Sequence, residues 1–351
     1  MTTGGRPFVD SDLSTRLDAI RVVAAVYVVL HHVCVHFGYD HGLGLLFRFG
    51  QEAVIVFFLL SGFVIYVNEA WRTADRGGYY ARRLLRLYPP LLAAMALSAL
   101  VALDNGEVSS MSNLRTLLGT LFMLQDIGAL KPGVIIDPYL DNAPLWSLSY
   151  EAAFYAVFPF IAAAMSRAPR ATVHAVGLSC VAAFLLYVVA PGHWALVASY
   201  FAIWWIGALC GRLYIDGRSA VPDLAVAGAY LALLTLTAGA TVVWAGFAGV
   251  GVYPFLLFRH FATALLFLPV GLWIGRLETI RLTSVAGGPI RWIASISYGL
   301  YIFHYPLLIQ WRRANGALGF AVATGLLMVL AYLFDRQLAK ALRPRPARRV
   351  P

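Results

Sequence analysis

Arg21 and His32 are the two residues whose types and spacing most directly suggest chemistry. They stand eleven positions apart, close to three turns of an α-helix, so in a helix they would share one face about 16 Å apart. The sequence from Val22 to Leu30 is uninterrupted apolar residues, which predicts a membrane-spanning helix. An ionisable group inside a membrane is costly and usually faces the protein interior or a wet cavity. We therefore expect this helix to line a reaction chamber, with Arg21 near a membrane surface and His32 near mid-depth.

The composition places this helix in an integral membrane protein. Of 351 residues, 60% are hydrophobic and only 13% are charged, and the mean hydropathy is +0.74, whereas soluble domains carry about 25% charged residues. The net charge of +10 requires no nucleic-acid partner, because basic residues collect on the cytoplasmic side of membrane proteins. Three cysteines lie inside apolar runs without metal-ligand spacing, so we expect neither a disulfide nor a redox role for Cys34, Cys180 and Cys210.

Ten apolar runs are long enough, or nearly long enough, to cross a bilayer. They are residues 20–37, 53–70, 84–103, 145–165, 172–190, 195–214, 224–244, 255–274, 293–310 and 318–338. An eleventh run, 114–127, is short and bracketed by Arg115 and Asp126, so we expect a surface or re-entrant helix. The prediction is an all-α polytopic membrane protein with about ten transmembrane helices and one extra short helix that does not cross.

The positions of lysine and arginine set the expected orientation. With the N-terminus inside and ten crossings, 21 of the 27 basic residues fall on the cytoplasmic side, which leaves outside only Arg48, Arg115, Lys131, Arg259, Arg312 and Arg313. We therefore expect a multi-pass protein of the plasma (inner) membrane with both termini cytoplasmic. Residues 1–15 lack the features of a signal peptide and are expected to be disordered, 16–338 to form the transmembrane domain, and the basic tail 339–351 to lie on anionic lipid.

Four further motifs follow the Arg21–His32 pair in a fixed order. They are GQEAVIVFFLLSGFVIY at 50–66, YYARRLLRLYPP at 79–90, PLWSLSYEAAFYAVFP at 144–159 and, more weakly, SYGLYIFHYPLL at 297–308. The set and its order resemble the acyltransferase-3 family of membrane O-acyltransferases, and the resemblance spans roughly residues 16–335. Hydropathy alone would indicate only a polytopic membrane protein.

The resemblance implies acyl transfer from a cytosolic acyl-CoA, with acetyl-CoA the first choice of donor. The implied acceptor is a hydroxyl of a cell-surface or exported carbohydrate or glycolipid; some relatives modify small secreted metabolites such as macrolides instead. His32 takes the place of the family's catalytic histidine. It could accept the proton of an attacking hydroxyl or carry the acyl group itself. The alternative is a buried histidine hydrogen-bonded to a neighbouring helix.

The arginines near the predicted cytoplasmic mouth are the candidate donor site. Arg21 could hold the phosphates of acyl-CoA in bidentate fashion, or it could be a topological anchor paired with Asp18. Three arginines open the third span and would form a second clamp or act as topology determinants alone: Arg82, Arg83 and Arg86. We expect the sequence Tyr88-Pro89-Pro90 just beyond them to kink or restart that helix.

The remaining candidates lie toward the other membrane surface. Glu151 could orient His32 in the manner of a catalytic triad, or bind the acceptor. Trp146 and Tyr150 are either interfacial belt residues or acceptor-binding residues. Glu52 and His304 are further acceptor-site candidates. The small pair Ser61-Gly62 on the span of Glu52 could instead simply allow close helix packing. A metal pair of His32 with His36 lacks any supporting ligand motif, so we expect no metal.

Two rival functions come from other classes. A proton-coupled secondary transporter would also need intramembrane His, Arg and Glu, but no internal repeat relates the two halves of the chain. A non-catalytic membrane assembly factor would tolerate alanine at His32. The sequence contains no GxSxG motif and no P-loop, so we expect neither a covalent serine nor nucleotide hydrolysis. It leaves open the acyl group, the acceptor and the oligomeric state.

Overall fold

The computed structural model describes residues 11–39, 41–72, 74–107, 113–276 and 287–341. Within these ranges every regular element is helical, apart from one isolated β-bridge between Gln125 and Ile136. The predicted all-α class is therefore confirmed. Most of the predicted N-terminal segment 1–15 and of the tail 339–351 lies outside the described residues.

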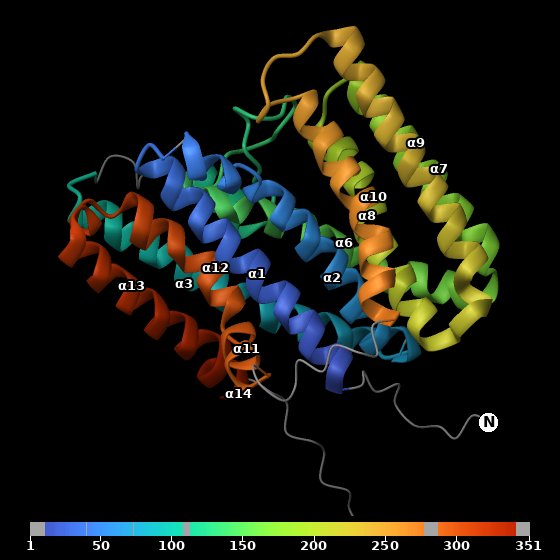
Figure 1. Ribbon diagram of the computed structural model, residues 1–351, viewed down its shortest axis with the longest axis horizontal. Coiled ribbons are helices and arrows are strands. Elements are labelled where there is room, and N and C mark those ends of the chain that lie inside the picture. Colours follow the sequence, from blue (N-terminus) through green and yellow to red (C-terminus); the bar gives the residue numbers. More distant parts are fainter. Residues whose placement is uncertain (1–10, 40, 73, 108–112, 277–286, 342–351) are drawn as a thin grey trace, which may run out of the picture.

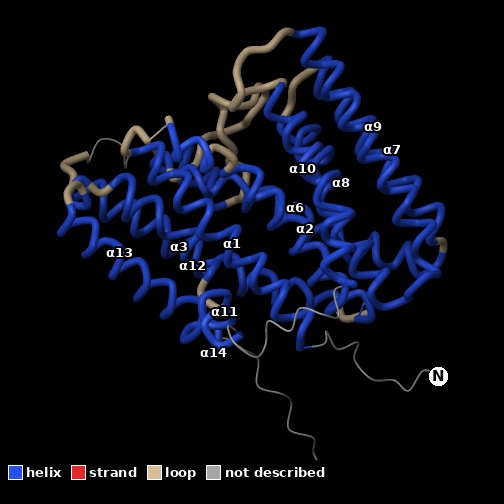
Figure 2. Tube along the Cα trace, viewed as in Figure 1, coloured by secondary structure: helices blue, strands red, loops and turns tan. Residues whose placement is uncertain are grey.

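The helices follow one another along the chain in a simple order (Figures 1 and 2). The longer ones are α1 (Ser11–His36), α2 (Gly50–Glu69), α3 (Arg76–Asp104), α5 (Leu114–Leu121), α6 (Trp146–Arg167), α7 (Pro169–Val189), α8 (His193–Asp216), α9 (Val221–Ala245), α10 (Phe255–Arg276), α11 (Gly287–Ala294), α12 (Ser297–His304) and α13 (Ala317–Tyr332). Two π-helical segments, η6 (Tyr305–Gln310) and η8 (Leu333–Leu338), extend α12 and α13, and α14 (Ala339–Ala341) follows. Short 3₁₀ turns are η1 (Gly42–Phe47), η2 (Ala70–Arg72), η3 (Tyr139–Asp141), η4 (Ala143–Leu145), η5 (Gly217–Ala220) and η7 (Arg312–Ala314).

The number of spans is close to the predicted ten. Eight helical stretches of the described chain are long and apolar enough to cross a membrane, and a ninth arises if α11 and α12–η6, bent by 47°, count as one. One stretch, His193–Ala245, is 53 residues long, far more than the roughly 20 residues that a span needs. It contains two helices, α8 and α9, separated at Gly217, whose φ of 63° breaks the helix. Each predicted run thus has a helix or bent pair of its own.

The first helix starts earlier than predicted, and this changes where its functional residues lie. The apolar run was expected to begin at residue 20, but α1 begins at Ser11, because its first turns are polar yet helical. Arg21 consequently lies nearly three turns into the helix, and His32 lies one turn before its C-terminal end. The expectation that Ser11–Thr15 is disordered is wrong.

The bundle has two distinct ends, which we call the basic end and the loop end. The start of α1 and the end of α13 lie at the basic end (Figure 1), where Arg21 and Lys340 line one cavity. The loop end holds the end of α3 and the connection before α13, joined by the ion pair Arg313–Asp104, 2.5 Å between Nη2 and Oδ1.

Helix α2 packs closely on α8 through glycines on both helices. A Cβ atom added to Gly62 would lie 2.1 Å from the carbonyl oxygen of Trp204, and one added to Gly207 would lie 2.0 Å from that of Leu59. Only glycine allows backbones to approach so closely. The small residue beside Ser61 therefore does serve helix packing, and it brings Ser61 of α2 against α8.

Two further predictions concern α5 and α3. The predicted short helix at 114–127 exists as α5 but ends at Leu121, and α5 is not among the described helices long enough to span a membrane. Helix α3 does not restart at its prolines: it continues through Pro89 and Pro90 as one helix of 29 residues.

Candidate active site

His32 is hydrogen-bonded to a second histidine from a distant part of the chain. Its Nδ1 lies 3.0 Å from Nε2 of His304, at the end of α12. Nδ1 of His304 lies 2.8 Å from the carbonyl oxygen of Tyr301 and 3.2 Å from that of Leu300. Carbonyl oxygens only accept, so this nitrogen of His304 carries a hydrogen and its Nε2 carries a lone pair. His32 therefore donates from Nδ1, which leaves its own Nε2 as the basic nitrogen.

The surroundings of this pair leave the basic nitrogen available. Among the described residues, no hydrogen bond to Nε2 of His32 occurs, and the ring is only partly buried. The ring of Tyr305 meets His32 edge-on, with centroids 5.1 Å apart. Tyr305 opens the π-helical segment η6, a geometry that is frequent at functional sites. His304 is fully buried, so it acts on an incoming substrate only through His32.

Glu151 does not orient His32. Its carboxylate accepts a hydrogen bond from Ser61 Oγ at 2.9 Å and a very short one from the Tyr155 hydroxyl. Nε1 of Trp204 donates to the same Ser61 hydroxyl at 3.2 Å. The residue hydrogen-bonded to His32 is His304 rather than Glu151, and the sequence could not reveal this because 272 positions separate the two histidines.

A proline explains how Tyr155 is positioned to hold Glu151. Pro159 in α6 has no N–H, so the carbonyl of Tyr155 loses its helical partner. The Tyr79 hydroxyl donates to that carbonyl at 3.0 Å, and the Tyr80 hydroxyl donates to the next carbonyl, of Ala156, at 2.9 Å. The tyrosines of the YYARR motif thereby fix the segment of α6 that carries the glutamate.

Glu151 lines a cavity in the middle of the bundle. This central cavity has a volume of about 350 Å³, and its polar lining residues include Arg21, Ser61, Arg83, Arg86, Glu151, Tyr155 and Tyr301. Tyr301 lies one helical turn before His304 on α12. His32 itself is not among the described lining residues, so the cavity ends about one turn short of the histidine pair.

A second cavity opens from the central one toward the basic end. It has a volume of about 630 Å³ and shares with the central cavity Arg21, Arg83, Arg86, Ser297 and Tyr298. Six of its sixteen described lining residues are cationic, namely Arg21, Arg82, Arg83, Arg86, Arg336 and Lys340, whereas one, Asp335, is a carboxylate. We call this space the basic mouth. Its field favours an anion.

The four predicted arginines of the mouth differ in how they are paired. Arg82 and Arg83 both bind the buried carboxylate of Glu69, at 2.7 and 3.0 Å. Arg82 also contacts Asp75 at 3.2 Å, and hydrogen bonds from the Gly78 amide and from Arg82 lower the pKa of the Asp75 carboxyl. Two of the predicted clamp residues therefore already have a partner.

Arg86 and Arg21 are more available to a ligand. Arg21 pairs with Asp18 through one nitrogen, 3.0 Å between Nη1 and Oδ1. Arg86 forms no hydrogen bond or ion pair with a described residue, and it is exposed to the two cavities that it lines. Its one close aromatic contact is the ring of Tyr298, 5.8 Å from the guanidinium carbon. A cation held without a partner between two cavities is the strongest anion-binding candidate of the set.

Sequence reasoning missed Asp335, a carboxylate of the same mouth. Its Oδ2 accepts the backbone N–H of Gly299 at 2.7 Å, and it lies close enough to Arg86 and Arg21 to interact electrostatically. The signal was an acidic residue near the end of the last apolar run, which hydropathy alone does not distinguish from a loop residue.

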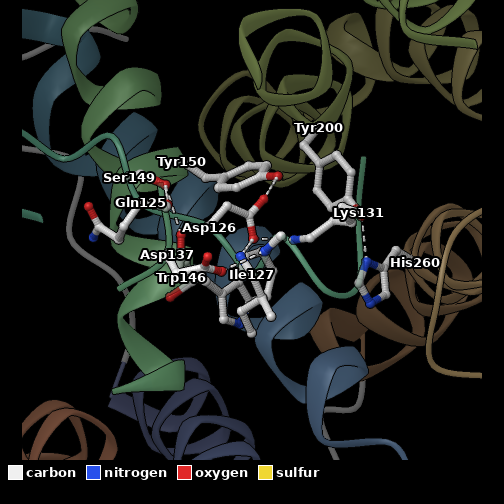
Figure 3. A network of polar contacts seen from close by, with 12 residues as sticks. Gln125, Asp126, Ile127, Lys131, Asp137, Trp146, Ser149, Tyr150, Tyr200 and His260 are labelled. Atoms are coloured by element: carbon white, nitrogen blue, oxygen red, sulfur yellow. Dashed lines mark hydrogen bonds and ion pairs between the residues drawn. The ribbon is translucent and has the colours of Figure 1, made fainter. Parts of the chain in front are cut away.

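Trp146 and Tyr150 are buried in a separate polar cluster, shown in Figure 3. Trp146 is 3% exposed, so its assignment to the interfacial belt is wrong. The Lys131 ammonium lies 4.1 Å from the centroid of the Trp146 ring, and it pairs with Asp126 at 2.6 Å. Tyr150 donates to the other Asp126 oxygen at 2.5 Å. Neither aromatic residue offers a face to an acceptor in this structure.

This cluster anchors the segment between α5 and α6, and we call it the loop anchor: Asp126, Lys131, Trp146 and Tyr150. Both charged side chains are fully buried. Burial lowers the pKa of the Lys131 ammonium, and the Asp126 carboxylate partly offsets that effect. Lys131 was expected only as an outside charge, because a sequence does not show that a loop folds back into the bundle.

Glu52 is likewise engaged by another helix. Its carboxylate forms an ion pair with Arg259 of α10, 2.6 Å between Nη2 and Oε1, and both side chains are nearly buried. The guanidinium of Arg259 lies 5.2 Å from the ring centroid of Phe49 and donates to the carbonyl of Val250 at 2.7 Å. Glu52 is not among the described residues that line the central cavity.

No group of three His, Cys, Asp or Glu side chains that could hold a metal ion occurs among the described residues.

Comparison with known proteins agrees with the geometry. The family described as "Acyltransferase domain" matches residues 14–334. The chain is 35% identical to "Acyltransferase MdmB" of Streptomyces mycarofaciens over 115 residues, which cover 31% of this chain and 28% of that protein. It is 25% identical to "Nodulation protein 10" of Rhizobium leguminosarum bv. viciae over 197 residues, 52% of this chain and 51% of that protein. The chain therefore matches at most about half the length of these relatives, and no solved structure matches it. Because the family match covers nearly the whole chain, including the histidine pair and four arginines of the basic mouth, this protein belongs to the acyltransferase-3 family of membrane acyltransferases.

Proposed function

We propose that this acyltransferase moves an acyl group, acetyl first, from a cytosolic acyl-CoA to a hydroxyl of a cell-surface or exported carbohydrate or glycolipid. The observation that carries the proposal is the pair of joined cavities. They lead from a mouth with six cationic residues to within one turn of α12 from the His32–His304 pair. The basic end is then the cytoplasmic end, and both termini lie on the cytoplasmic side of the plasma membrane.

The basic mouth is the proposed donor site. Coenzyme A carries several phosphate charges, and arginine binds phosphate through paired, charge-assisted hydrogen bonds. Arg86 has no partner to give up among the residues that the structure describes, whereas Arg82 and Arg83 would first have to share Glu69. The thioester arm would extend from Arg86 into the central cavity, past Glu151 and Tyr155 toward Tyr301.

His32 is the proposed general base. The acceptor hydroxyl oxygen attacks the thioester carbonyl carbon while Nε2 of His32 takes the hydroxyl proton. The carbon–sulfur bond then breaks, and the coenzyme A thiolate leaves and takes up that proton, so the products are the ester and free coenzyme A. His304 fixes the tautomer of His32 through the 3.0 Å hydrogen bond and supports the imidazolium that forms. It is a positioning residue.

A covalent relay is the alternative at the same residue. His32 Nε2 would attack the thioester, release coenzyme A and pass the acyl group to the acceptor afterwards. Acyl-imidazoles hydrolyse readily, so we favour direct transfer. Incubating the purified protein with radiolabelled acetyl-CoA in the absence of acceptor, and then quenching the reaction, separates the two routes. Stoichiometric label that is lost in His32→Ala would overturn direct transfer.

The test of the function is release of coenzyme A by the purified protein when it is supplied with acetyl-CoA and with an extract of surface glycans and secreted metabolites as the source of acceptor, because direct transfer needs both substrates. We expect His32→Ala to lower the rate by at least about 100-fold, the usual contribution of a general base. His36→Ala is the matched control, because His36 is an exposed histidine one turn along the same helix. Wild-type release in His32→Ala would overturn the assignment. A secondary transporter would release no coenzyme A in either protein.

The acceptor class has its own test. Mass spectrometry of surface glycans and of secreted metabolites, from cells with and without the gene, would locate the missing acyl group. An acyl group lost from a glycan supports the carbohydrate acceptor. One lost from a small secreted metabolite would support the other acceptor class that the family resemblance leaves open.

A further inference from the structure

A polar pocket at the loop end lies outside the machinery described so far. Its volume is about 490 Å³, within the range of small-molecule sites. The end of α3, the start of α5, the turn η3 and the end of η6 form its walls. Its polar lining residues include Asn105, Glu107, Asn113, Thr116, Asp141 and Gln310, and no lysine or arginine occurs among its described lining residues.

The walls of this pocket are fixed by hydrogen bonds between distant segments. Asn105 Nδ2 donates to the carbonyl of Gln310 at 2.8 Å, and its Oδ1 accepts the backbone N–H of Arg312 at 3.1 Å. Gln310 Nε2 donates to the carbonyl of Leu140 at 2.6 Å. The pocket therefore has a defined shape before any ligand enters.

Two polar groups at the pocket have no partner of their own. The Asp141 carboxylate forms no hydrogen bond or ion pair with a described residue, and it is exposed. Asn142, the next residue, is fully buried and is not itself among the described lining residues. Its Oδ1 has no hydrogen-bond partner among the described residues, while its Nδ2 donates to the pocket residue Ser98 at 3.2 Å. An unpaired buried carbonyl is costly unless a ligand or water satisfies it.

The backbone at Asp141 is strained, which is unusual outside functional sites. Leu140 has φ of 52° and Asp141 has φ of 53°, both in the left-handed region that side chains other than glycine rarely adopt. The strain turns the two residues so that both line the pocket.

One element, η6, runs from the pocket to the histidine pair, and neither histidine is among the described lining residues of the pocket. Gln310 ends η6, and Tyr305, which begins η6, lies with its ring edge-on to His32, centroids 5.1 Å apart. Asp141 lies close enough to Tyr305 for an electrostatic interaction with its hydroxyl. A ligand held against Asp141 would thus lie beside the residue that covers His32, at the opposite end of the bundle from the basic mouth.

We infer that this pocket binds the acceptor, as a hydroxyl-rich unit that carries no acidic group. The inference rests on the proposed function and adds the acceptor's site and charge. Amide, hydroxyl and carboxylate groups suit sugar hydroxyls. Glu107 is already paired with Arg312 at 2.8 Å, so the carboxylate of Asp141, with no lysine or arginine among the described lining residues, is the group that disfavours an anionic acceptor. The basic mouth has the reverse charge, so electrostatics directs the anionic donor to the mouth and away from this pocket.

The test compares two sugars that differ only in one carboxylate. Saturation-transfer difference NMR on the purified full-length protein would measure binding of methyl β-glucoside and methyl β-glucuronide. We expect the glucoside to bind and the glucuronide to bind at least about tenfold more weakly. Asp141→Asn, which suits the left-handed backbone, should weaken glucoside binding and narrow the difference between the two sugars.

Asp137→Asn is the matched control. It removes a carboxylate from the same segment but keeps an oxygen for the Gly128 N–H that Asp137 binds at 2.8 Å, and Asp137 is not among the described lining residues. We expect wild-type sugar binding in this variant. Equal binding of both sugars, no binding of either, or an Asp141→Asn variant identical to wild type would overturn the pocket. Sugar binding is measured without turnover. The result therefore tests the pocket even if the acyltransferase assay fails.

Discussion

Two clusters of charged side chains lie inside the bundle, and they are built in opposite ways. In the loop anchor, Lys131 and Asp126 are fully buried and pair with each other at 2.6 Å. In the basic mouth, Arg86 faces two cavities and has no hydrogen-bonded or ionic partner among the described residues. The first cluster has no access to a ligand. The second holds a cation that has Asp335 nearby but forms no direct ion pair with a described residue.

The difference separates a structural role from a binding role. In a buried ion pair each charge compensates the other, so removing one partner leaves an uncompensated buried charge and destabilises the fold. A cation in a wet cavity keeps part of its hydration, so it can persist unpaired until an anion replaces the water. We therefore expect mutations in the loop anchor to change stability and mutations in the mouth to change acyl-CoA affinity.

The largest effect should come from breaking the loop anchor. Lys131→Met leaves the Asp126 carboxylate buried without its cation, which should destabilise the protein by about 3–5 kcal/mol. Thermal unfolding of the detergent-solubilised protein would measure it. The double variant Lys131→Met/Asp126→Asn should recover part of the loss, because no buried charge remains. If Lys131→Met were as stable as wild type, the loop anchor would have no structural role.

A smaller effect, of a different kind, should follow in the mouth. Arg86→Ala should weaken acyl-CoA binding by roughly 10- to 150-fold, the value of one lost charge-assisted contact of about 1.5–3 kcal/mol. The unfolding temperature should stay near that of wild type, because Arg86 has no described partner to leave unpaired. Calorimetric titration with acetyl-CoA measures the affinity.

Arg82→Gln sharpens that comparison within the mouth. Arg82 lies beside Arg83 but already pairs with Glu69 at 2.7 Å, so its loss should change acyl-CoA affinity less than the loss of Arg86 does. Part of its effect should appear as reduced stability, since Glu69 is 5% exposed. Equal losses of affinity in the two variants would show that pairing does not decide which arginine binds the donor.

The smallest effect should come from a pair that is neither enclosed nor in a cavity. Arg313 and Asp104 pair at the loop end, with side chains 71% and 31% exposed. Exposed pairs contribute about 0–1 kcal/mol, so Arg313→Gln should leave both the unfolding temperature and acyl-CoA affinity nearly unchanged. A large loss in this variant would mean that surface charge, rather than burial and pairing, determines the other results.

Some of this site could be predicted from the sequence because it depends on local spacing. The eleven-residue step from Arg21 to His32 and the two tyrosines before Arg82 and Arg83 belong to single helices. The helical class and the spans followed from hydropathy, because the bilayer imposes length and polarity on every span.

What the sequence could not reveal is which helices meet. The contact of His304 with His32 depends on how α12 crosses α1, and the pairing of Lys131 with Asp126 depends on a loop that folds inward. Trp146 resembles an interfacial residue by its place in the sequence, but its ring is covered by Lys131, Phe58 and His260 from other parts of the chain. Asp335 enters the mouth only because α13 returns to the start of α1 and α3.

The most direct test of the account is the rate of coenzyme A release against acetyl-CoA concentration, for wild type, Arg86→Ala and His32→Ala. We predict that Arg86→Ala raises KM by at least about tenfold while kcat changes little. In His32→Ala, kcat should fall by at least about 100-fold, and calorimetric acetyl-CoA affinity should stay near that of wild type. An unchanged KM in Arg86→Ala, or wild-type kcat in His32→Ala, would contradict the account.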